Sequence, residues 1–188
     1  MISNRRSILA GLAIIATTPV AMAQAQKQTF AELTAAPMNF AEIKAAPQFF
    51  MGVLGPAELS LSTSQIAVEK ATQKNTHEFA GFELGEAITV NMVLKDLGTM
   101  APALDSKGMV TVEKMKAAGK GVAFDRAYIA FQLANHEFLR DLADGYLHNS
   151  AGSSDPMEKQ GRHLASLMLA VFKEHVAICK RINAELNV

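Results

Sequence analysis

The sequence lacks features on which several common classes of protein depend. It has one cysteine, Cys179, no tryptophan and only two tyrosines in 188 residues. A single cysteine excludes an internal disulfide, and we predict that Cys179 is a small buried apolar residue. Basic and acidic side chains are equal in number, 18 of each, and Lys and Arg form no basic stripe. The sequence therefore gives no indication of a nucleic-acid partner.

Several motifs that indicate a particular chemistry are also missing. The sequence has no Cys-x-x-Cys-His for haem attachment, no phosphate-binding loop and no nucleophile elbow. It also has no Glu-x-x-His, a motif that ferritin-type di-iron proteins carry on two helices. These absences argue against an enzyme that activates oxygen at a bridged metal pair, and we predict no catalytic residue.

The first 23 residues have the organisation of a cleaved export signal. A short basic segment that ends in Arg5 and Arg6 precedes a largely apolar stretch at 8–17. Small side chains at Ala21 and Ala23 then occupy the positions three and one before the expected cleavage. The apolar stretch is shorter than the roughly 20 residues that span a bilayer. We therefore predict a mature protein that is soluble in the periplasm and has no transmembrane segment.

The paired arginines also resemble the motif of the twin-arginine export route. In the segment NRRSIL at 4–9, the arginine pair and the two apolar residues after Ser7 fit that motif. The leading Asn4 and the lack of a basic residue after Leu9 fit it less well. Twin arginines also occur in ordinary secretory signals, so both export routes stay open.

A repeat marks residues 24–48, which we interpret as a leader. The segment FAELTAAP at 30–37 returns as FAEIKAAP at 40–47, with a period of ten. Each copy is long enough for about one and a half helical turns before its proline ends the helix. We predict a semi-flexible spacer, and the alternative is an arm that docks on an envelope protein.

Residues 49–188 have the periodicity of four long helices, and no stretch has the alternation of a strand. Two helix starts carry capping signals, Asn75 with Glu78 and Asp155 with Glu158. Two helical hairpins joined by a longer connection predict an all-α domain, a four-helix bundle. The expected helices are 49–73, 75–97, 123–147 and 156–186, with a short helix near 112–118.

An ionisable side chain interrupts the apolar stripe of three of these helices. Glu58, Glu86 and His175 take inward positions, and the third long helix offers Asp125 and His136 at the shoulder of its stripe. Burying a lone carboxylate costs several kcal/mol unless a partner compensates. Carboxylate and imidazole groups that meet at one level would form a mixed oxygen and nitrogen metal site. Two interpretations of these residues stay open, a structural polar network and a site for a transition-metal ion.

The levels of these residues along the helices can be compared by counting from the hairpin turns. Counted this way, Asp125 matches His175 in height better than His136 does. Asp125 and His136 are eleven residues apart, about 16 Å along a helix, so they cannot both bind one ion. The other three histidines are expected at the surface; they are His77, His148 and His163.

Several of these residues belong to a recognisable pattern. Its elements are ELSLS-x-x-x-IA-x-EKA at 58–71, Phe-Ala at 79–80, FDRAY at 124–128, His136 and His175. The chain thereby resembles the bacterial family called domain of unknown function 4142, often labelled an outer membrane protein. The resemblance covers roughly 49–182 and implies an exported, ferritin-like helical bundle with no established reaction.

One departure from the family pattern falls in the second helix. Where the family has an Asp-His pair, this chain has Gly85 and Glu86. A carboxylate in place of an imidazole is compatible with metal binding, but it weakens any role that needs a proton shuttle near neutral pH. The family's marked positions correspond to Glu58, Glu86, Asp125, Tyr128, His136 and His175.

These observations lead to one expected function and one alternative. We expect an exported periplasmic helical-bundle protein that binds a metal ion or a small ligand in its core. The alternative is a non-catalytic envelope interaction or stress-related protein whose inward polar residues are structural.

Overall fold

The computed structural model describes residues 39–100 and 102–188, and its described part is all-helical, with no strand. The expected signal residues Arg5, Arg6, Ala21 and Ala23 and the first copy of the repeat lie outside the described residues. No helix in the described part is both long and apolar enough to cross a membrane. The elements are η1 (Phe40–Glu42), α3 (Ala46–Lys70), α4 (Lys74–Asp96), α5 (Ser106–Ala117), α6 (Val122–Asn149) and α7 (Pro156–Leu186).

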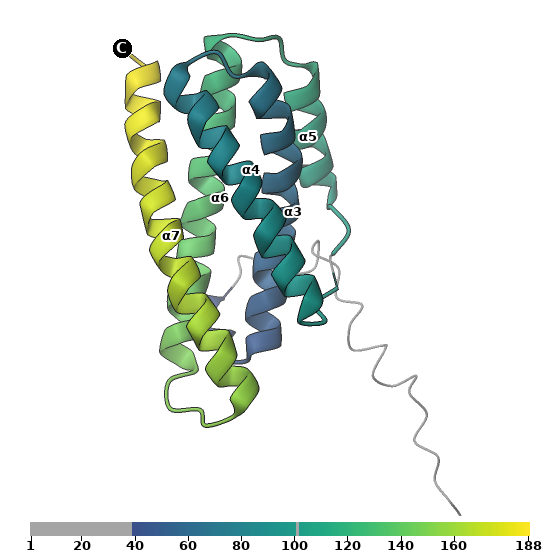
Figure 1. Ribbon diagram of the computed structural model, residues 1–188, viewed down its shortest axis with the longest axis vertical. Coiled ribbons are helices and arrows are strands. Elements are labelled where there is room, and N and C mark those ends of the chain that lie inside the picture. Colours follow the sequence, from purple (N-terminus) through teal and green to yellow (C-terminus); the bar gives the residue numbers. More distant parts are fainter. Residues whose placement is uncertain (1–38, 101) are drawn as a thin grey trace, which may run out of the picture.

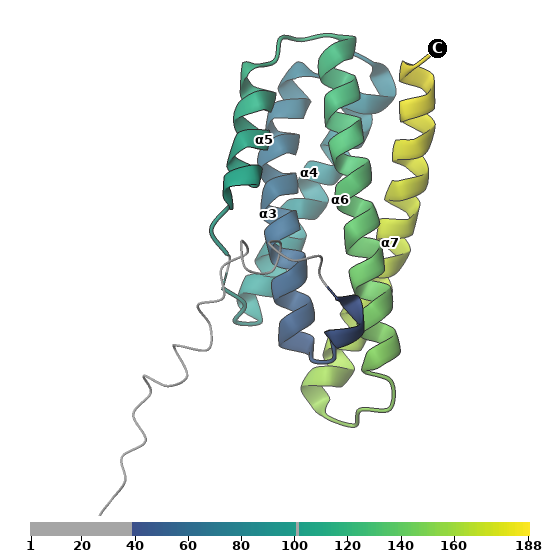
Figure 2. The same cartoon turned by 180° about the vertical axis from the view of Figure 1, so that it is seen from behind.

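The four long helices lie side by side along the long axis of the molecule (Figure 1). α3 packs against α4, α6 packs against α7, and the two pairs meet mainly through α3 and α6. The shorter α5 lies on the outer side of α3 (Figure 2). The turn between α3 and α4 and the C-terminus of α7 are at one end, and the loop between α6 and α7 is at the other.

The predicted helices are confirmed, with ends that differ by a few residues. The last helix begins as its sequence predicts, because the Asp155 side chain accepts hydrogen bonds from the N–H groups of Met157 and Glu158 at 2.8 and 3.1 Å. The predicted cap of α4 is wrong, since Gln73 rather than Asn75 accepts the bond from the Thr76 N–H. The short helix begins at Ser106, earlier than the expected residue 112.

The second copy of the repeat differs from the expected spacer. Pro47 lies in the first turn of α3 instead of ending a helix, because a first-turn residue needs no hydrogen-bond donor. The Asn149 side chain donates to the carbonyls of Phe40 and Ile43 at 2.8 and 3.2 Å. Ile43 is itself buried in the core. Residues 39–48 are therefore part of the packed helical structure.

The core consists of two apolar clusters with a polar layer between them. One cluster surrounds Phe49, Leu142 and Phe172, and the other surrounds Phe124 and Ile182. Each long helix has at least one buried polar side chain between the stretches that supply these clusters. The polar layer consists of Ser60, Thr63 and Ser64 of α3, Glu83 of α4, Gln132 and His136 of α6 and His175 of α7.

Candidate metal centre

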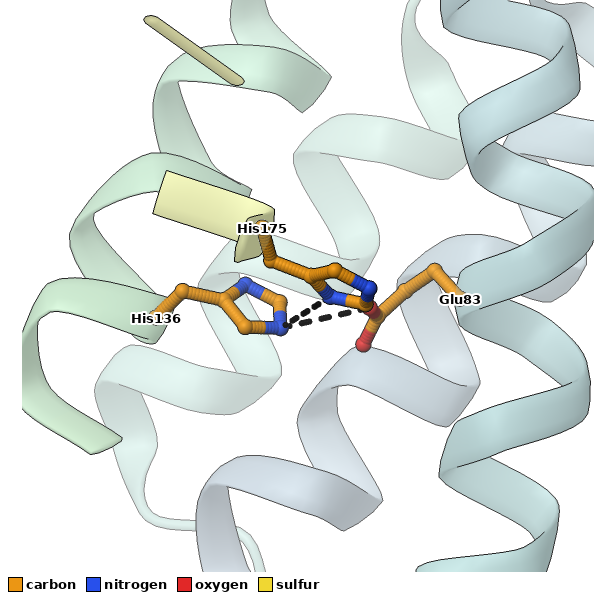
Figure 3. Close-up of side chains that lie close together, drawn as sticks. All are labelled: Glu83, His136 and His175. Atoms are coloured by element: carbon orange, nitrogen blue, oxygen red, sulfur yellow. Dashed lines mark hydrogen bonds and ion pairs between the residues drawn. The ribbon is translucent and has the colours of Figure 1, made fainter. Parts of the chain in front are cut away.

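Three buried side chains from three helices converge on one point in the polar layer (Figure 3). His136 Nε2 lies 3.0 Å from His175 Nδ1, and Glu83 Oε2 lies 3.2 Å from His136 Nε2 and 3.0 Å from His175 Nδ1. The exposed fraction of each residue is 5% or less. We call Glu83, His136 and His175 the Glu-His-His cluster.

The hydrogen bond at the far side of the His136 ring determines which nitrogen faces the cluster. His136 Nδ1 lies 2.8 Å from the carbonyl oxygen of Gln132, one turn earlier in α6. A carbonyl only accepts, so Nδ1 carries the hydrogen. In the neutral ring, Nε2 therefore points its lone pair at His175 and Glu83.

His175 is oriented in the same way by a carboxylate. Its Nε2 lies 3.1 Å from Glu86 Oε2, and the Glu86 side chain is 46% exposed. Because a carboxylate accepts from Nε2–H, the neutral ring of His175 points the Nδ1 lone pair into the cluster. Phe79 makes an edge-to-face contact with the His175 ring, and Phe172 makes one with the His136 ring.

The two oxygens of Glu83 have different surroundings. Oε1 accepts a hydrogen bond from the Ser60 hydroxyl, which also lies 3.0 Å from Gln132 Oε1. Oε2 has the two ring nitrogens as its neighbours, and no other donor in the described part of the chain bonds to it. The cluster thus brings together three atoms that each have a lone pair, and only a proton or a cation between them offsets their repulsion.

In the metal-free protein, the pKa values show that protons stabilise this arrangement. Burial raises the pKa of the Glu83 carboxyl, but contacts with His136, His175 and Ser60 outweigh burial and lower it from 4.5 to about 2. Burial lowers the pKa of His175, but Glu83 and Glu86 outweigh it and raise the value from 6.5 to about 9. The His175 imidazolium therefore faces the Glu83 carboxylate at neutral pH.

The spacing of the three atoms fits the ligands of a transition-metal ion. Ligands at right angles with bonds of about 2.1 Å lie about 3.0 Å apart, and tetrahedral ligands lie about 3.4 Å apart. The observed distances of 3.0, 3.0 and 3.2 Å match one face of an octahedron closely and a tetrahedral set after a small expansion. Imidazole and carboxylate donors suit zinc, iron, copper or nickel.

A cavity of about 510 Å³ lies beside the Glu-His-His cluster. α4 and α7 form most of its lining, and α3 and α6 complete it with buried side chains. Glu83 and His136 line the cavity, and so does Glu86. The cluster is therefore open on one side to a space large enough for a small molecule.

The structure brings together only part of the predicted ligand set. His136 and His175 both belong to the Glu-His-His cluster, and Glu86 contacts the outer nitrogen of His175. Glu58 lies outside it, because its carboxylate pairs with Lys95 Nζ at 2.5 Å at a partly exposed position. His77, His148 and His163 are exposed, as predicted.

Asp125 is also buried outside the cluster, so its predicted role as a partner of His175 is wrong. Its carboxylate accepts hydrogen bonds from the N–H of Thr72 at 3.0 Å, the Thr72 hydroxyl at 2.7 Å and the N–H of Gln73 at 2.9 Å. These bonds hold the turn between α3 and α4 against α6. The family-pattern residue Tyr128 is buried next to this region, where its hydroxyl contacts Ser64 Oγ at 2.8 Å.

Glu83 was absent from the predicted set, because Glu86 was predicted as the inward acid of α4. Phe82 is 62% exposed, and the buried face instead follows Phe79, Glu83, Ala87 and Asn91 at intervals of four. A small residue and an amide in that row gave no apolar signal. The interval of four residues between Phe79 and Glu83 could have predicted the position, because it places both side chains on the same face of the helix.

Comparisons of the chain with protein-family models, with curated proteins and with solved structures each gave no match.

Proposed function

We propose that the protein binds one divalent transition-metal ion through Glu83 Oε2, His136 Nε2 and His175 Nδ1. The observation that carries the proposal is the triangle of 3.0, 3.0 and 3.2 Å between three buried atoms whose lone pairs face one another. An ion at this point replaces the proton between His175 and Glu83 and becomes the common partner of all three atoms.

The outer contacts of the ligands support a metal role more than a purely structural one. Metal-binding histidines usually donate the second ring N–H to a carbonyl or a carboxylate, which fixes the tautomer. His136 does so to the Gln132 carbonyl, and His175 does so to Glu86. Each ligand therefore has a partner that leaves the correct atom free for the ion.

The wider proposal follows the sequence. We propose an exported, periplasmic protein of the domain of unknown function 4142 family, with a ferritin-like four-helix bundle and a signal removed after Ala23. The function is binding, and no reaction is included. Mass spectrometry of protein from the periplasm tests the export step, because a mature chain that begins at Gln24 is expected.

Calorimetric titration of chelator-treated protein with Zn²⁺ tests the metal site. We expect about one equivalent to bind, and Glu83→Gln, His136→Gln and His175→Gln each to weaken binding more than about 100-fold. His163→Gln is the matched control, since it removes an exposed histidine of the same helix as His175. Its affinity should equal that of the unaltered protein.

Two outcomes contradict the proposal. One is zinc far below one equivalent, and the other is an unchanged affinity in all three cluster variants. Circular dichroism of each variant establishes that it is folded, so that a loss of binding reports on the ligands. If the proposal fails, the alternative of an envelope interaction protein with a structural polar layer remains.

A further inference from the structure

The cavity beside the Glu-His-His cluster combines a long apolar lining with polar groups at one place. Val53, Leu139, Met168 and Phe172 give it an apolar interior. Among the described residues, the ionisable ones that line it are Glu83, Glu86 and His136. This combination is typical of sites that bury an apolar body and orient one polar group of a small molecule.

The edge of the cavity carries large apolar side chains that face solvent. Phe82 is 62% exposed, Leu167 is 69% exposed and Val171 is 36% exposed, and all three line the cavity. Phe82 lies on α4, while Leu167 and Val171 lie on α7, so apolar groups flank the cavity on two sides. An apolar ligand would cover this surface and extend its contacts from the interior to the edge.

The charges of the lining restrict the polar group of the ligand. No Lys or Arg of the described part of the chain lines the cavity, so this lining supplies no guanidinium or ammonium group for a phosphate or a sulfate. Glu83 and Glu86 make the metal-free cavity unfavourable for any anion. A divalent ion at the Glu-His-His cluster offsets the two negative charges of Glu83 and Glu86, and a single carboxylate group can then bind to the ion itself.

We propose that the cavity binds a small amphiphile with an extended apolar body and a single carboxylate, such as a medium-chain fatty acid. The head group lies toward Glu83 and His136, and the apolar body lies between α4 and α7. This inference rests on the proposed metal site, because the ion supplies the charge that the head group needs.

Calorimetric titration with sodium decanoate tests the inference. Full-length mature protein is loaded with one equivalent of Zn²⁺, freed of excess metal and compared with chelator-treated protein. We expect one decanoate to bind the loaded protein, and affinity for the chelator-treated protein to be at least about tenfold weaker. Loading is measured separately by elemental analysis, so a failure to bind zinc is distinguished from a failure to bind decanoate.

Substitutions at the edge of the cavity locate the ligand. Phe82→Ser and Leu167→Ser should each weaken decanoate binding roughly fivefold and leave the zinc affinity unchanged, because these exposed side chains contact only the apolar body. Met109→Ser is the matched control, since Met109 is 53% exposed on α5 and does not line the cavity. Its affinity for decanoate should not change.

Three results overturn the inference while the metal site stands. The first is a zinc-loaded protein that does not bind decanoate. The second is equal binding with and without zinc, which would show that the head group does not contact the ion. The third is a dimer by light scattering that Phe82→Ser converts to a monomer, which would mean that a second copy covers the cavity edge.

Discussion

Asp125 and Glu83 are both buried carboxylates, but they lie in different regions and are satisfied in opposite ways. At the turn between α3 and α4, Asp125 accepts bonds from two backbone N–H groups and one hydroxyl of Thr72 and Gln73. In the polar layer, Oε2 of Glu83 faces two ring nitrogens and accepts no bond from a backbone group.

The partners of the two carboxylates distinguish a residue that stabilises the fold from a residue that can bind a ligand. Donors fixed in the backbone satisfy a carboxylate completely and leave no capacity for a ligand. Ring nitrogens hold a proton that an ion can replace, so the same burial leaves a site that accepts a cation. The partners of a buried carboxylate therefore predict its role better than its burial does.

The largest expected effect is the loss of stability on removing Asp125. Asp125→Ala leaves the N–H groups of Thr72 and Gln73 without their acceptor, and we expect the free energy of unfolding to fall by about 3 kcal/mol. Urea unfolding followed by circular dichroism measures the change. Asp141→Ala, at an exposed residue paired with Arg140, is the control and should cost less than about 0.5 kcal/mol. A similar cost in both variants would contradict the structural role.

The second prediction separates the two regions by their response to metal. At a zinc concentration about 100 times the dissociation constant, the unaltered protein should gain about 2.7 kcal/mol of stability. Asp125→Ala should gain the same amount from its lower baseline, and Glu83→Gln should gain nothing. The comparison is made by urea unfolding with and without Zn²⁺. If both variants lost the stability gained from zinc, the two carboxylates would belong to the same metal site.

The third prediction concerns the pH dependence of the metal-free protein. The pKa of His175, about 9 in the folded state, lies above its usual 6.5, so its stabilising contribution is complete below pH 6.5 and is lost as the pH rises through 9. The pKa of Glu83, about 2, lies below 4.5, so its contribution is present above pH 4.5 and is lost as the pH falls through 2. Stability from this pair is therefore greatest between pH 4.5 and 6.5.

Urea unfolding in the presence of a chelator measures this profile. We expect a loss of about 2 kcal/mol between pH 6.5 and 9.5. His175→Gln should remove most of this loss, and His163→Gln should keep it. A profile that is unchanged in His175→Gln would show that the polar layer does not control the alkaline loss.

The helices were largely predictable because their signals are local. The cap at Asp155 and the periodicity of α6 and α7 are confirmed within a few residues. Pro47 misled the prediction because a proline either ends a helix or occupies its first turn, and only packing decides between the two. Here the deciding packing is the contact of residues 39–48 with α6, which lies about 100 residues later in the chain.

The site was predictable only in part, because it depends on how the helices are placed. His175 was found since it interrupts a clear apolar row in α7. His136 was predicted to match His175 in height less well than Asp125 does. That prediction counted residues from the loop between α6 and α7, and such a count assumes that the two helices begin at the same height along the bundle. His136 is 13 residues before the end of α6 and His175 is 19 residues after the start of α7, yet their rings touch.

The smallest expected effect concerns the Thr72 hydroxyl, which donates a hydrogen bond to the Asp125 carboxylate. Chemical labelling of Cys179 measures this effect. The Cys179 thiol is fully buried in the cluster around Phe124, and burial with the charge of Glu83 raises its pKa to about 12. A thiol reagent at pH 8 should therefore label it only when the structure opens. Thr72→Val keeps the backbone bonds to Asp125 and removes only the hydroxyl bond of 2.7 Å.

We expect Thr72→Val to cost about 1 kcal/mol and to raise the labelling rate about fivefold, because a hydrogen bond to a carboxylate is lost at the edge of this apolar cluster. Thr111→Val is the matched control, since the Thr111 hydroxyl donates to the Lys107 carbonyl of its own helix. Labelling of Thr72→Val at the unaltered rate would mean that the backbone donors alone satisfy Asp125. In that case the contrast with Glu83 would depend on the two backbone N–H groups, which Thr72→Val leaves in place.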